Sequence, residues 1–379
     1  MKRLKVMTIV GTRPEVIKLS RVIAALARHT DHVLVHSGQN FDHELNEVFF
    51  QELEIPRPDH FLGVGGKSVA ESIGEIIVKS DAVLASERPD ALLVYGDTNT
   101  CLCVIPAKRR KIPVFHMEAG NRCFDQRVPE EINRKIVDHL SDINLPLTEQ
   151  ARGYLLGEGL RPETVIKTGS TMREVLDHYA PGIERSSVLE QLALRAGEYL
   201  LVSMHREENV DTESRLVGIL ETLRAVAGRY ARRLVVSTHP RTRTRLERIP
   251  GATKALEAEG VTFLKPFGFF DYARLQASSF CVISDSGTVT EESALLGFPA
   301  ITLREAHERP EGMDAGTLVM SGLATDSVLQ AIDLVTSRPA GERPGIPPDY
   351  LERHVSTKVV QIIQSYTDYV NRTVWRKQG

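Results

Sequence analysis

The sequence has little of what marks a metalloprotein. It contains 4 cysteines among 379 residues, and they show neither C-x-x-C nor zinc-finger spacing. Because free cysteine within apolar runs behaves as a small hydrophobe, we expect reduced and mostly buried thiols. The 12 histidines include no H-E-x-x-H pair. We therefore predict no bound metal.

Long apolar runs are missing as well. No stretch approaches the roughly 20 residues that cross a bilayer, and the apolar part of "MKRLKVMTIVGTRPE" is too short for the core of a signal peptide. With 47 basic and 50 acidic residues, the net charge of -3 creates no field that attracts nucleic acid or an anionic membrane. We predict a cytoplasmic protein with neither nucleic acid nor membrane as a partner.

Two widespread phosphate-binding motifs are also absent. The sequence contains neither a Walker A motif nor G-x-G-x-x-G, which disfavours the phosphate loops of ATP-binding and NAD-binding proteins. The glycine-rich "GVGGK" at 63–67 is at most a flexible loop. We expect no cofactor.

What the sequence does contain is a regular alternation of strand and helix patterns. Compact β-rich runs alternate with helical spacings, of which Val16, Leu19, Ile23 and Leu26 are an example. Such alternation predicts parallel sheets covered by helices on both faces. The expected strands are residues 4–10, 32–38, 91–96, 112–117 and 142–147, followed by 199–204, 233–239, 261–267, 280–287 and 299–304.

The length of the chain suits two domains of ordinary size. A charged stretch with an Ala-Pro-Gly break interrupts the alternation, so we expect an α/β fold of two doubly wound domains. In the first domain, Ile132, Ile136 and Leu140 predict one apolar helix face. The expected parts are an N-terminal domain at 1–172, a linker region at 173–198, a C-terminal domain at 199–350 and a final helix within 351–379, whose apolar face needs a surface to cover.

Polar residues follow several expected strands. Arg13, Lys18, Asp97 and Glu118 lie at or just beyond strand ends of the first domain, and His205 follows a strand of the second. In open parallel sheets, ligands bind beyond the carboxyl ends of the strands. We therefore expect one site between the two domains.

These residues also have plainer interpretations. Asp97 can cap the helix that follows it, and Arg13 can be solvated. Glu130 and Glu131 follow a proline, so they can be first-turn acids that the helix dipole favours. None of these interpretations explains Glu118.

The stretch "SDSGTVTEE" of the second domain predicts a nucleotide site. Backbone N–H groups around Ser286 and Gly287, at the start of a helix, can hold a phosphate. Glu292 lies less than two turns into that helix, where its carboxylate can accept both hydroxyls of a ribose. Together these features suggest a nucleoside diphosphate. The alternative is that Ser286 caps the helix and Glu292 is solvated.

The motifs together resemble the non-hydrolysing UDP-N-acetylglucosamine 2-epimerases. "GTRPEVIK", "GDT", "HMEAG", "PEEINR", "TGST", "HREEN", "SDSG" and "HERPE" occur in the order and at about the spacing of that family, from Gly11 to Gly316. The longer strings "GNRCFDQRVPEEINRKIVDH" and "AHERPEGMDAGTLVMSGL" are similar to a narrower group, the UDP-N-acetyl-L-fucosamine synthases. Those enzymes epimerise UDP-2-acetamido-2,6-dideoxy-L-talose at C2.

The resemblance implies two Rossmann-like domains that face each other across a cleft, as in GT-B glycosyltransferases, with the final helix crossing back to the first domain. It implies an isomerase that eliminates UDP to give a 2-acetamidoglycal and adds it back, without nicotinamide or metal. It also implies a homodimer and a UDP-sugar product used for a cell-surface polysaccharide such as capsule or O-antigen.

By the same resemblance, Asp97, Glu118 and Glu130 are the acid/base carboxylates, Arg134 structures their surroundings, and Glu131 is structural. Because three neighbouring acids repel one another, at least one should have a raised pKa. The residues expected to bind the substrate and its UDP are Arg13, Lys18, Arg134, His205 (also counted as catalytic), Ser286, Gly287, Glu292 and Arg309.

The sequence departs from the broader family in three places. The connection after Glu118 is shorter than in the UDP-N-acetylglucosamine enzymes and contains Cys123 and Phe124, together with Asn121, where their pattern differs. Thr288 replaces a usual glycine. His307 stands where threonine is common.

Four other functions are compared with the predicted epimerisation of UDP-2-acetamido-2,6-dideoxy-L-talose. The first is a non-hydrolysing epimerase of UDP-N-acetylglucosamine and UDP-N-acetylmannosamine. The second is a hydrolysing 2-epimerase, which releases free sugar. The third is a GT-B glycosyltransferase, which needs an acceptor and no trio of carboxylates. A regulator that binds nucleotide without chemistry is the fourth, and the full set of Asp97, Glu118, Glu130 and His205 disfavours it.

Overall fold

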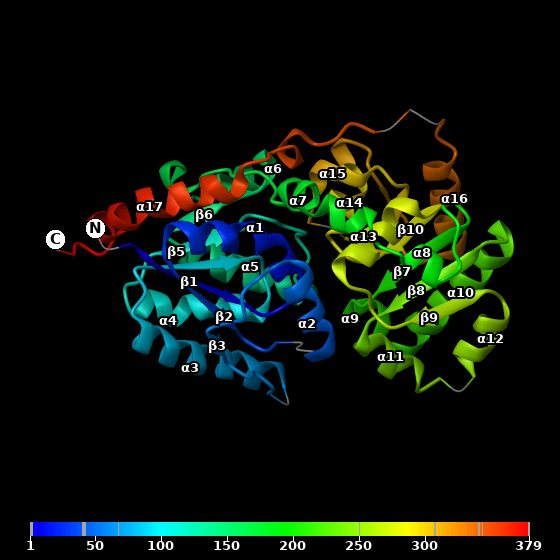
Figure 1. Ribbon diagram of the computed structural model, residues 1–379, viewed down its shortest axis with the longest axis horizontal. Coiled ribbons are helices and arrows are strands. Elements are labelled where there is room, and N and C mark those ends of the chain that lie inside the picture. Colours follow the sequence, from blue (N-terminus) through cyan, green and yellow to red (C-terminus); the bar gives the residue numbers. More distant parts are fainter. Residues whose placement is uncertain are drawn as a thin grey trace. The chain divides into compact units, whose positions relative to one another are not determined.

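The computed structural model describes residues 3–39, 43–66, 68–249, 251–306, 308–339, 342 and 344–377, with the side chains of 43–47, 207, 208 and 252 excepted. The chain forms two compact units. The first comprises residues 1–178 and 348–379, and the second comprises residues 179–347. Each unit is built on one parallel sheet (Figure 1).

The sheet of the first unit has the strand order β3-β2-β1-β4-β5-β6, and all its pairs are parallel. This is the order of the Rossmann fold. The strands are β1 (Lys5–Val10), β2 (Asp31–His36), β3 (His60–Phe61), β4 (Ala91–Tyr95), β5 (Val114–Met117) and β6 (Ile143–Leu145).

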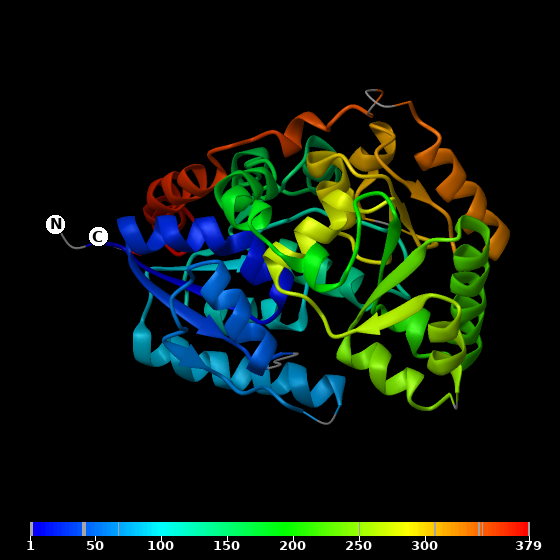
Figure 2. The ribbon, with the colours of Figure 1, turned by 45° about the vertical axis from the view of Figure 1, so that its right-hand side comes forward.

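Helices cover both faces of this sheet. Side chains of α3, α4 and α5 share one apolar cluster with the strands. Helix α17, from the end of the chain, packs beside α1, as two views show (Figure 1, Figure 2). The helices are α1 (Arg13–His29), α2 (His43–Glu52), α3 (Val69–Glu87), η1 (Asn99–Cys103), α4 (Val104–Arg109), α5 (Pro129–Leu140), α6 (Glu149–Gly157), η2 (Pro162–Thr164), α7 (Met172–Glu184), which crosses the unit boundary, η3 (Pro348–Tyr350) and α17 (Val355–Thr373).

The second unit repeats this architecture with the strand order β12-β11-β10-β7-β8-β9. Its strands are β7 (Tyr199–Met204), β8 (Arg233–Thr238), β9 (Val261–Leu264), β10 (Cys281–Ser284), β11 (Ala300–Thr302) and β12 (Val319–Met320). Its helices are α8 (Val188–Gln191), α9 (Glu207–Val210), α10 (Glu213–Tyr230), α11 (Pro240–Leu246), α12 (Ala252–Ala258), α13 (Phe269–Ser278), α14 (Val289–Leu296), α15 (Pro310–Asp314) and α16 (Thr325–Thr336). The α/β class and the two Rossmann-like, doubly wound domains predicted from the sequence are confirmed.

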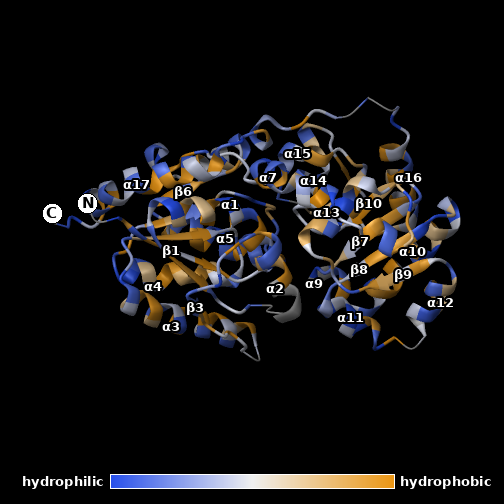
Figure 3. Ribbon diagram, viewed as in Figure 1, coloured by the Kyte–Doolittle hydropathy of each residue, from blue (hydrophilic) through white to orange (hydrophobic). Residues whose placement is uncertain are grey.

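The cores form where the sequence is most continuously apolar. The central strands of both sheets are buried along most of their length, as parallel strands between two helix layers must be. Figure 3 shows hydrophobic residues gathered along these strands. On α1, the predicted face of Val16, Leu19, Ile23 and Leu26 is buried. No helix within the described ranges is long and apolar enough to cross a membrane.

Helix α5 forms as predicted, but of its predicted apolar face only Leu140 packs against the core. Ile132 is 51% exposed and Ile136 is 37% exposed. The helix instead buries a largely polar face, which includes Glu131, Arg134 and Asp138. The periodicity identified the helix but not the face that is buried, because the polar side chains on that face form ion pairs with charged groups.

Candidate active site

Both sheets place polar loops at equivalent topological positions. The strand order changes direction between β1 and β4 in the first unit, and between β7 and β10 in the second. In open parallel sheets, ligands bind at the carboxyl ends of the strands at such a point. The loops after these four strands carry residues 11–12, 96–98, 205–206 and 285–287. Each loop therefore lies where its unit is expected to bind a ligand.

Asp97 is held by an arginine from α5. The Nε atom of Arg134 lies 2.7 Å from Oδ2 of Asp97, and the arginine is buried while the carboxylate is 19% exposed. Asn133 of the same helix donates to the main-chain carbonyl of Asp97 over 2.9 Å. Thr98 occupies the N-cap position of η1, so the alternative in which Asp97 caps that helix is wrong. Asp97 is fixed and still accessible to a ligand.

Glu118 has an unusual backbone conformation and two polar partners. Its φ is +61°, in the left-handed region that costs a residue with a side chain about 1–3 kcal/mol. Its Oε2 atom accepts a hydrogen bond from the Tyr95 hydroxyl over 2.8 Å and lies 2.7 Å from Nζ of Lys18. A Cβ atom at Gly96 would lie 3.7 Å from Oε1 of Glu118. The Glu118 carboxylate therefore lies against the residue that precedes Asp97.

The two acids at the start of α5 differ in their surroundings. Glu131 is buried; it accepts hydrogen bonds from the N–H groups of Cys123 (3.0 Å) and Phe124 (3.3 Å), and Nη1 of Arg134 lies 3.0 Å away. Burial favours a higher pKa, but these donors outweigh it and hold the pKa of Glu131 below its usual value. Such contacts suit a structural residue. Glu130 is half-buried, and within the described part of the chain no hydrogen-bond or ion-pair partner reaches its carboxylate.

Glu15, a carboxyl that the sequence analysis did not single out, has a raised pKa. Burial raises the pKa of Glu15 to about 7. Its oxygens accept hydrogen bonds from the N–H groups of Gly11 (2.5 Å) and Thr12 (3.1 Å) and from the hydroxyl of Thr98 (2.6 Å). Glu15 therefore ties the loop after β1 to the loop after β4. The capping-box spacing of Thr12 and Glu15 was the available sequence signal.

The two cations of the first unit that were predicted to bind diphosphate have different environments. Arg13 is half-buried, with its guanidinium carbon 5.8 Å from the ring centre of Phe49, a cation–π distance. Lys18 is buried against Glu118, and its ammonium lies 5.6 Å from the ring centre of Tyr95. Lys18 thus forms an ion pair with Glu118, a predicted acid/base residue. The role of Lys18 in binding diphosphate stays a prediction.

In the second unit, His205 is held by a buried carboxylate. Asp285 is fully buried and accepts hydrogen bonds from the N–H groups of His205 (3.0 Å) and Arg206 (3.0 Å). Nδ1 of His205 lies 3.2 Å from Oδ1 of Asp285, and the imidazole is 38% exposed. Asn209 also donates to this carboxylate. Asp285, which the sequence analysis passed over, orients the loop that presents His205; its place directly after β10 was the signal.

The predicted phosphate loop precedes α14. Thr288, directly before the first residue of α14, already has helical dihedral angles and no side-chain cap bond. The hydroxyl of Ser286 accepts a 3.4 Å hydrogen bond from the N–H group of Thr288, so the alternative in which Ser286 caps the helix is supported. The hydroxyls of Ser286 and Thr288 lie 3.1 Å apart. A Cβ atom at Gly287 would lie 2.7 Å from Oε1 of Glu308, so the loop can pass this carboxylate because Gly287 has no side chain. Ser286, Gly287 and Thr288 are half-buried, and the N–H group of Ser286 donates to the hydroxyl of Ser284 over 3.1 Å.

The two neighbouring acids of α14 have separate partners. Glu291 is fully buried, and its Oε2 lies 3.0 Å from Nη1 of Arg309, which is 4% exposed. Glu292 is half-buried and accepts a 2.6 Å hydrogen bond from Gln276. Glu291 therefore anchors Arg309, which was predicted to bind nucleotide. The sequence analysis had not distinguished Glu291 from its neighbour Glu292.

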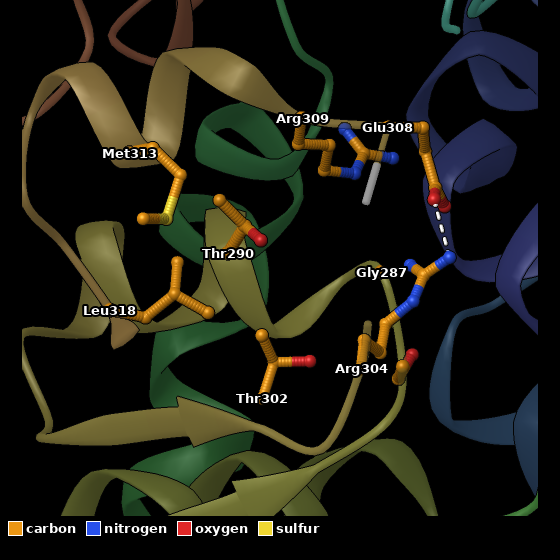
Figure 4. Close-up of a pocket in the computed structure, with 9 residues that line it drawn as sticks. Gly287, Thr290, Thr302, Arg304, Glu308, Arg309, Met313 and Leu318 are labelled. Atoms are coloured by element: carbon orange, nitrogen blue, oxygen red, sulfur yellow. Dashed lines mark ion pairs between the residues drawn. The ribbon is translucent and has the colours of Figure 1, made fainter. Parts of the chain in front are cut away.

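A small pocket of about 10 Å³, room for one water molecule, adjoins this loop. Figure 4 shows Thr290, Thr302, Met313 and Leu318 on one side of it, with three charged residues on the other. The charged residues are Arg304, Glu308 and Arg309, and the first two form an ion pair with Nη2 2.7 Å from Oε2.

Three further points of the sequence analysis concern His307, metal binding and the cysteines. His307 lies outside the described residues. Among the residues that the structure does describe, no group of three or more His, Cys, Asp or Glu side chains is placed to hold a metal ion. Three of the four cysteines are buried, and Cys123 is partly exposed.

Comparison with known proteins identifies the family. A family model described as UDP-N-acetylglucosamine 2-epimerase matches residues 24–364. The chain belongs to this family. A solved structure of UDP-N-acetylglucosamine 2-epimerase from Rickettsia bellii is 53% identical to it, covers 99% of this chain and 100% of its own, and has a TM-score of 0.92. The family and the enzyme class predicted from the sequence, isomerase, are confirmed.

Two further members of the family show its breadth. The UDP-N-acetylglucosamine 2-epimerase of Methanocaldococcus jannaschii, solved with UDP-N-acetylglucosamine and UDP, is 31% identical, covers 96% of this chain and 100% of its own, and has a TM-score of 0.89. The UDP-2,3-diacetamido-2,3-dideoxy-D-glucuronate 2-epimerase of Pseudomonas aeruginosa is 34% identical over 86% of this chain and 91% of its own. The family thus includes epimerases named for different sugars.

Proposed function

We propose that this protein is a non-hydrolysing UDP-sugar 2-epimerase that interconverts UDP-2-acetamido-2,6-dideoxy-L-talose and UDP-N-acetyl-L-fucosamine. The observation that carries the proposal is the grouping of acids at one sheet edge in a member of this family. Glu118 lies against the residue before Asp97, each of the two has a buried cation, and Glu130 begins the helix that supplies Arg134.

The reaction needs acids and cations because the hydrogen at C2 is not next to a carbonyl group. When the C1–O bond breaks, UDP departs with the bonding electrons and positive charge develops at C1, so the proton at C2 becomes acidic. A carboxylate takes that proton, and a 2-acetamidoglycal forms with a C1–C2 double bond. UDP then adds back to C1 while an acid delivers a proton to the opposite face of C2.

The acid/base groups in this proposal are Asp97, Glu118 and Glu130. The partial exposure of Asp97 and Glu118, 19% and 11%, leaves each able to meet a sugar. The two buried cations, Lys18 and Arg134, stabilise their ionised forms. Glu130 is set apart by the lack of a partner within the described chain, which suits an acid that exchanges its proton during turnover.

The second unit would hold the UDP. Ser286 and Gly287, just before α14, suit the diphosphate because the positive end of the helix dipole lies there, and His205 and Arg309 would add polar contacts near the departing oxygen. Glu292 would accept the ribose hydroxyls. In this scheme Arg13 and Lys18 of the first unit also contribute to the binding of the diphosphate.

The choice of a 6-deoxy sugar rests on the loop after Glu118. Its string "GNRCFDQRVPEEINR" resembles that of the fucosamine synthases, and the loop presents Phe124, which is 69% exposed and packs edge-on against Tyr154 at 5.2 Å between ring centres. An apolar ring suits a methyl group at C6 better than a hydroxyl, which needs a polar partner. The second candidate substrate is UDP-N-acetylglucosamine, for which the relatives from Rickettsia bellii and Methanocaldococcus jannaschii are named.

We also infer a cytoplasmic homodimer whose product enters a cell-surface polysaccharide. The dimer and the use of the product rest on the resemblance of the motifs to the family, and the cytoplasmic location rests on the lack of a membrane-length apolar run. Light scattering during size-exclusion chromatography tests the dimer, and a mass equal to the 42.2 kDa of one chain would contradict it.

Proton NMR in D₂O tests the function. The purified protein is incubated with UDP-2-acetamido-2,6-dideoxy-L-talose and, separately, with UDP-N-acetylglucosamine. We expect deuterium at C2 of the talose compound while a fuco-configured UDP-sugar grows and no free sugar accumulates. Exchange of the glucosamine compound alone would establish the second candidate. Free sugar appearing at the pace of turnover would show a hydrolysing enzyme, and no exchange with either compound would refute the epimerase.

Variants of the acids complete the test. D97N, E118Q and E130Q should each lose about 10²–10⁴ in turnover. The matched control is D125N, because Asp125 lies in the same loop region but pairs with the exposed Arg127. It should retain most of the wild-type rate, and an equal loss in D125N would mean that the loop, not acid/base chemistry, was disturbed.

A further inference from the structure

A fully buried carboxylate on α5, that of Asp138, lies beneath the loop that follows Glu118. The N–H group of Gly120 donates to both of its oxygens at 3.2 Å. Nη1 of Arg122 donates to Oδ2 over 2.7 Å, and Nδ1 of His116 lies 2.9 Å from Oδ1. Asp138, Arg122 and His116 are all 0% exposed at their side chains.

These contacts fix the chain on both sides of Glu118. The N–H group of Gly120, two residues after Glu118, donates to this carboxylate, and Nδ1 of His116, two residues before Glu118, lies against it without a hydrogen bond. One carboxylate therefore contacts both flanks of the residue with φ of +61°. A strained conformation of this kind persists when its surroundings determine it. Arg122 extends the anchor, because its guanidinium also donates to Glu158 from Nε over 2.8 Å and from Nη2 over 2.7 Å.

The same network reaches the loop that carries Asp97. Nε2 of His116 lies 2.7 Å from the carbonyl oxygen of Gly96, the residue before Asp97. Since a carbonyl oxygen only accepts hydrogen bonds, Nε2 of His116 is the donor. A chain of buried contacts therefore runs from Asp138 through His116 to the backbone at Gly96.

We infer that Asp138 is a positioning residue for the epimerisation, because through Gly120, Arg122 and His116 it sets the backbone that aims Glu118 and Asp97. This inference rests on the function proposed above. Asp138 does not reach the substrate in this scheme; its effect is on where the two carboxylates stand. Misplacement of reacting groups by about 1 Å can cost roughly 10²-fold in rate.

The variant D138N tests the inference. Asparagine offers one acceptor oxygen where the carboxylate has two. Its NH₂ group is itself a donor, so it cannot accept from the N–H groups that point at the second oxygen. We expect kcat to fall by roughly 10²-fold, with KM and the affinity for UDP close to wild type, because the UDP-binding residues of the second unit are untouched. Hydrogen exchange of the segment 117–124 should accelerate, because the N–H group of Gly120 loses one of its two acceptor oxygens.

A matched control comes from the other end of β5. Asp142 is also buried and accepts a 2.9 Å hydrogen bond from the N–H group of Val114, at the start of that strand, and a 2.5 Å bond from Lys108. D142N should lower stability while leaving kcat near wild type. If D138N fails to fold, H116Q breaks the link to Gly96 while the pair of Asp138 and Arg122 remains, and it should lower kcat in the same way.

The outcomes separate the inference from the proposed function. Lower kcat in D138N or H116Q at unchanged KM, with D142N near wild type, supports a positioning role. The inference is overturned if folded D138N keeps the wild-type kcat. It is also overturned if D142N and D138N both lose kcat in proportion to their loss of stability. If the wild-type protein exchanges C2–H of neither UDP-sugar, the proposed function fails and this inference fails with it.

Discussion

Lys18 and Glu118, 100 residues apart in the sequence, form an ion pair with Nζ 2.7 Å from Oε2. Their side chains are 2% and 11% exposed, so little water screens the pair. The contact stabilises the ionised carboxylate of Glu118, a predicted proton acceptor, and the ammonium needs that carboxylate because a buried unpaired charge is costly.

Replacement of Lys18 by methionine should lower kcat, since the Glu118 carboxylate, 11% exposed, loses the ammonium that lies 2.7 Å from it, and a nearly buried charge that loses its ion-pair partner is costly. Steady-state rates with the UDP-sugar measure the loss, and K79M is the control, because Lys79 makes an exposed pair with Glu75 in the same unit. A raised KM with kcat close to wild type would instead favour the diphosphate role of Lys18.

Glu15 should make stability depend on pH. Its pKa is raised from 4.5 to about 7 by burial, so between these values the folded protein binds a proton that the unfolded chain releases. The free energy of unfolding contributed by this group therefore falls as the pH rises from about 4.5 to 7, by about 3 kcal/mol in all.

E15Q should remove most of that dependence, because glutamine does not titrate. Urea unfolding of both proteins from about pH 5 to 8 measures it. The control is E71Q, since Glu71 has the same position in the capping box of α3 but is exposed. Identical pH slopes in wild type and E15Q would contradict the prediction.

The neighbouring acids of α14 should affect different properties. E291Q removes the carboxylate that faces the buried Arg309, and breaking such a pair typically costs about 3–5 kcal/mol of stability. E292Q keeps an oxygen that can accept from Gln276, so it should cost about 1 kcal/mol or less, but it should weaken the binding of UDP if Glu292 holds the ribose. Urea unfolding and titration calorimetry with UDP distinguish the two, and unchanged UDP affinity in E292Q would argue against the ribose role.

The exposed face of α5 can be checked by a pair of alanine variants. I132A should change the free energy of unfolding by about 0.5 kcal/mol or less, because Ile132 is 51% exposed. V137A should cost about 2 kcal/mol, because Val137 is fully buried and its loss leaves a cavity. A larger cost for I132A than for V137A, measured by urea unfolding, would mean that this helix face is covered in solution.

Much of the fold follows from local sequence. Each expected strand was found within a few residues of its predicted bounds, because continuous apolar runs and helical spacings act over short distances. The two strands that were missed, β3 and β12, have two residues each. Strands so short lie at the sheet edges and carry no pattern of their own.

The candidate site could be located from the sequence but its internal partners could not. Asp97 and Glu118 follow β-rich runs, and the carboxyl ends of parallel strands meet at one edge, so their proximity was predictable. That Lys18 would meet Glu118, and Arg134 would meet Asp97, depends on the register of helices against the sheet. The raised pKa of Glu15 depends on burial, which follows from that packing.

The sequence by itself determined the α/β class, the two Rossmann-like units, the family and the chemical types of the residues at the strand ends, because each of these is written in local pattern or in motifs. Only the tertiary structure decided which charges pair, which face of α5 is buried, and that Asp138 anchors the chain around Glu118. The physical reason is that burial and pairing are properties of groups brought together from distant parts of the chain, and their free energies depend on that environment rather than on residue type.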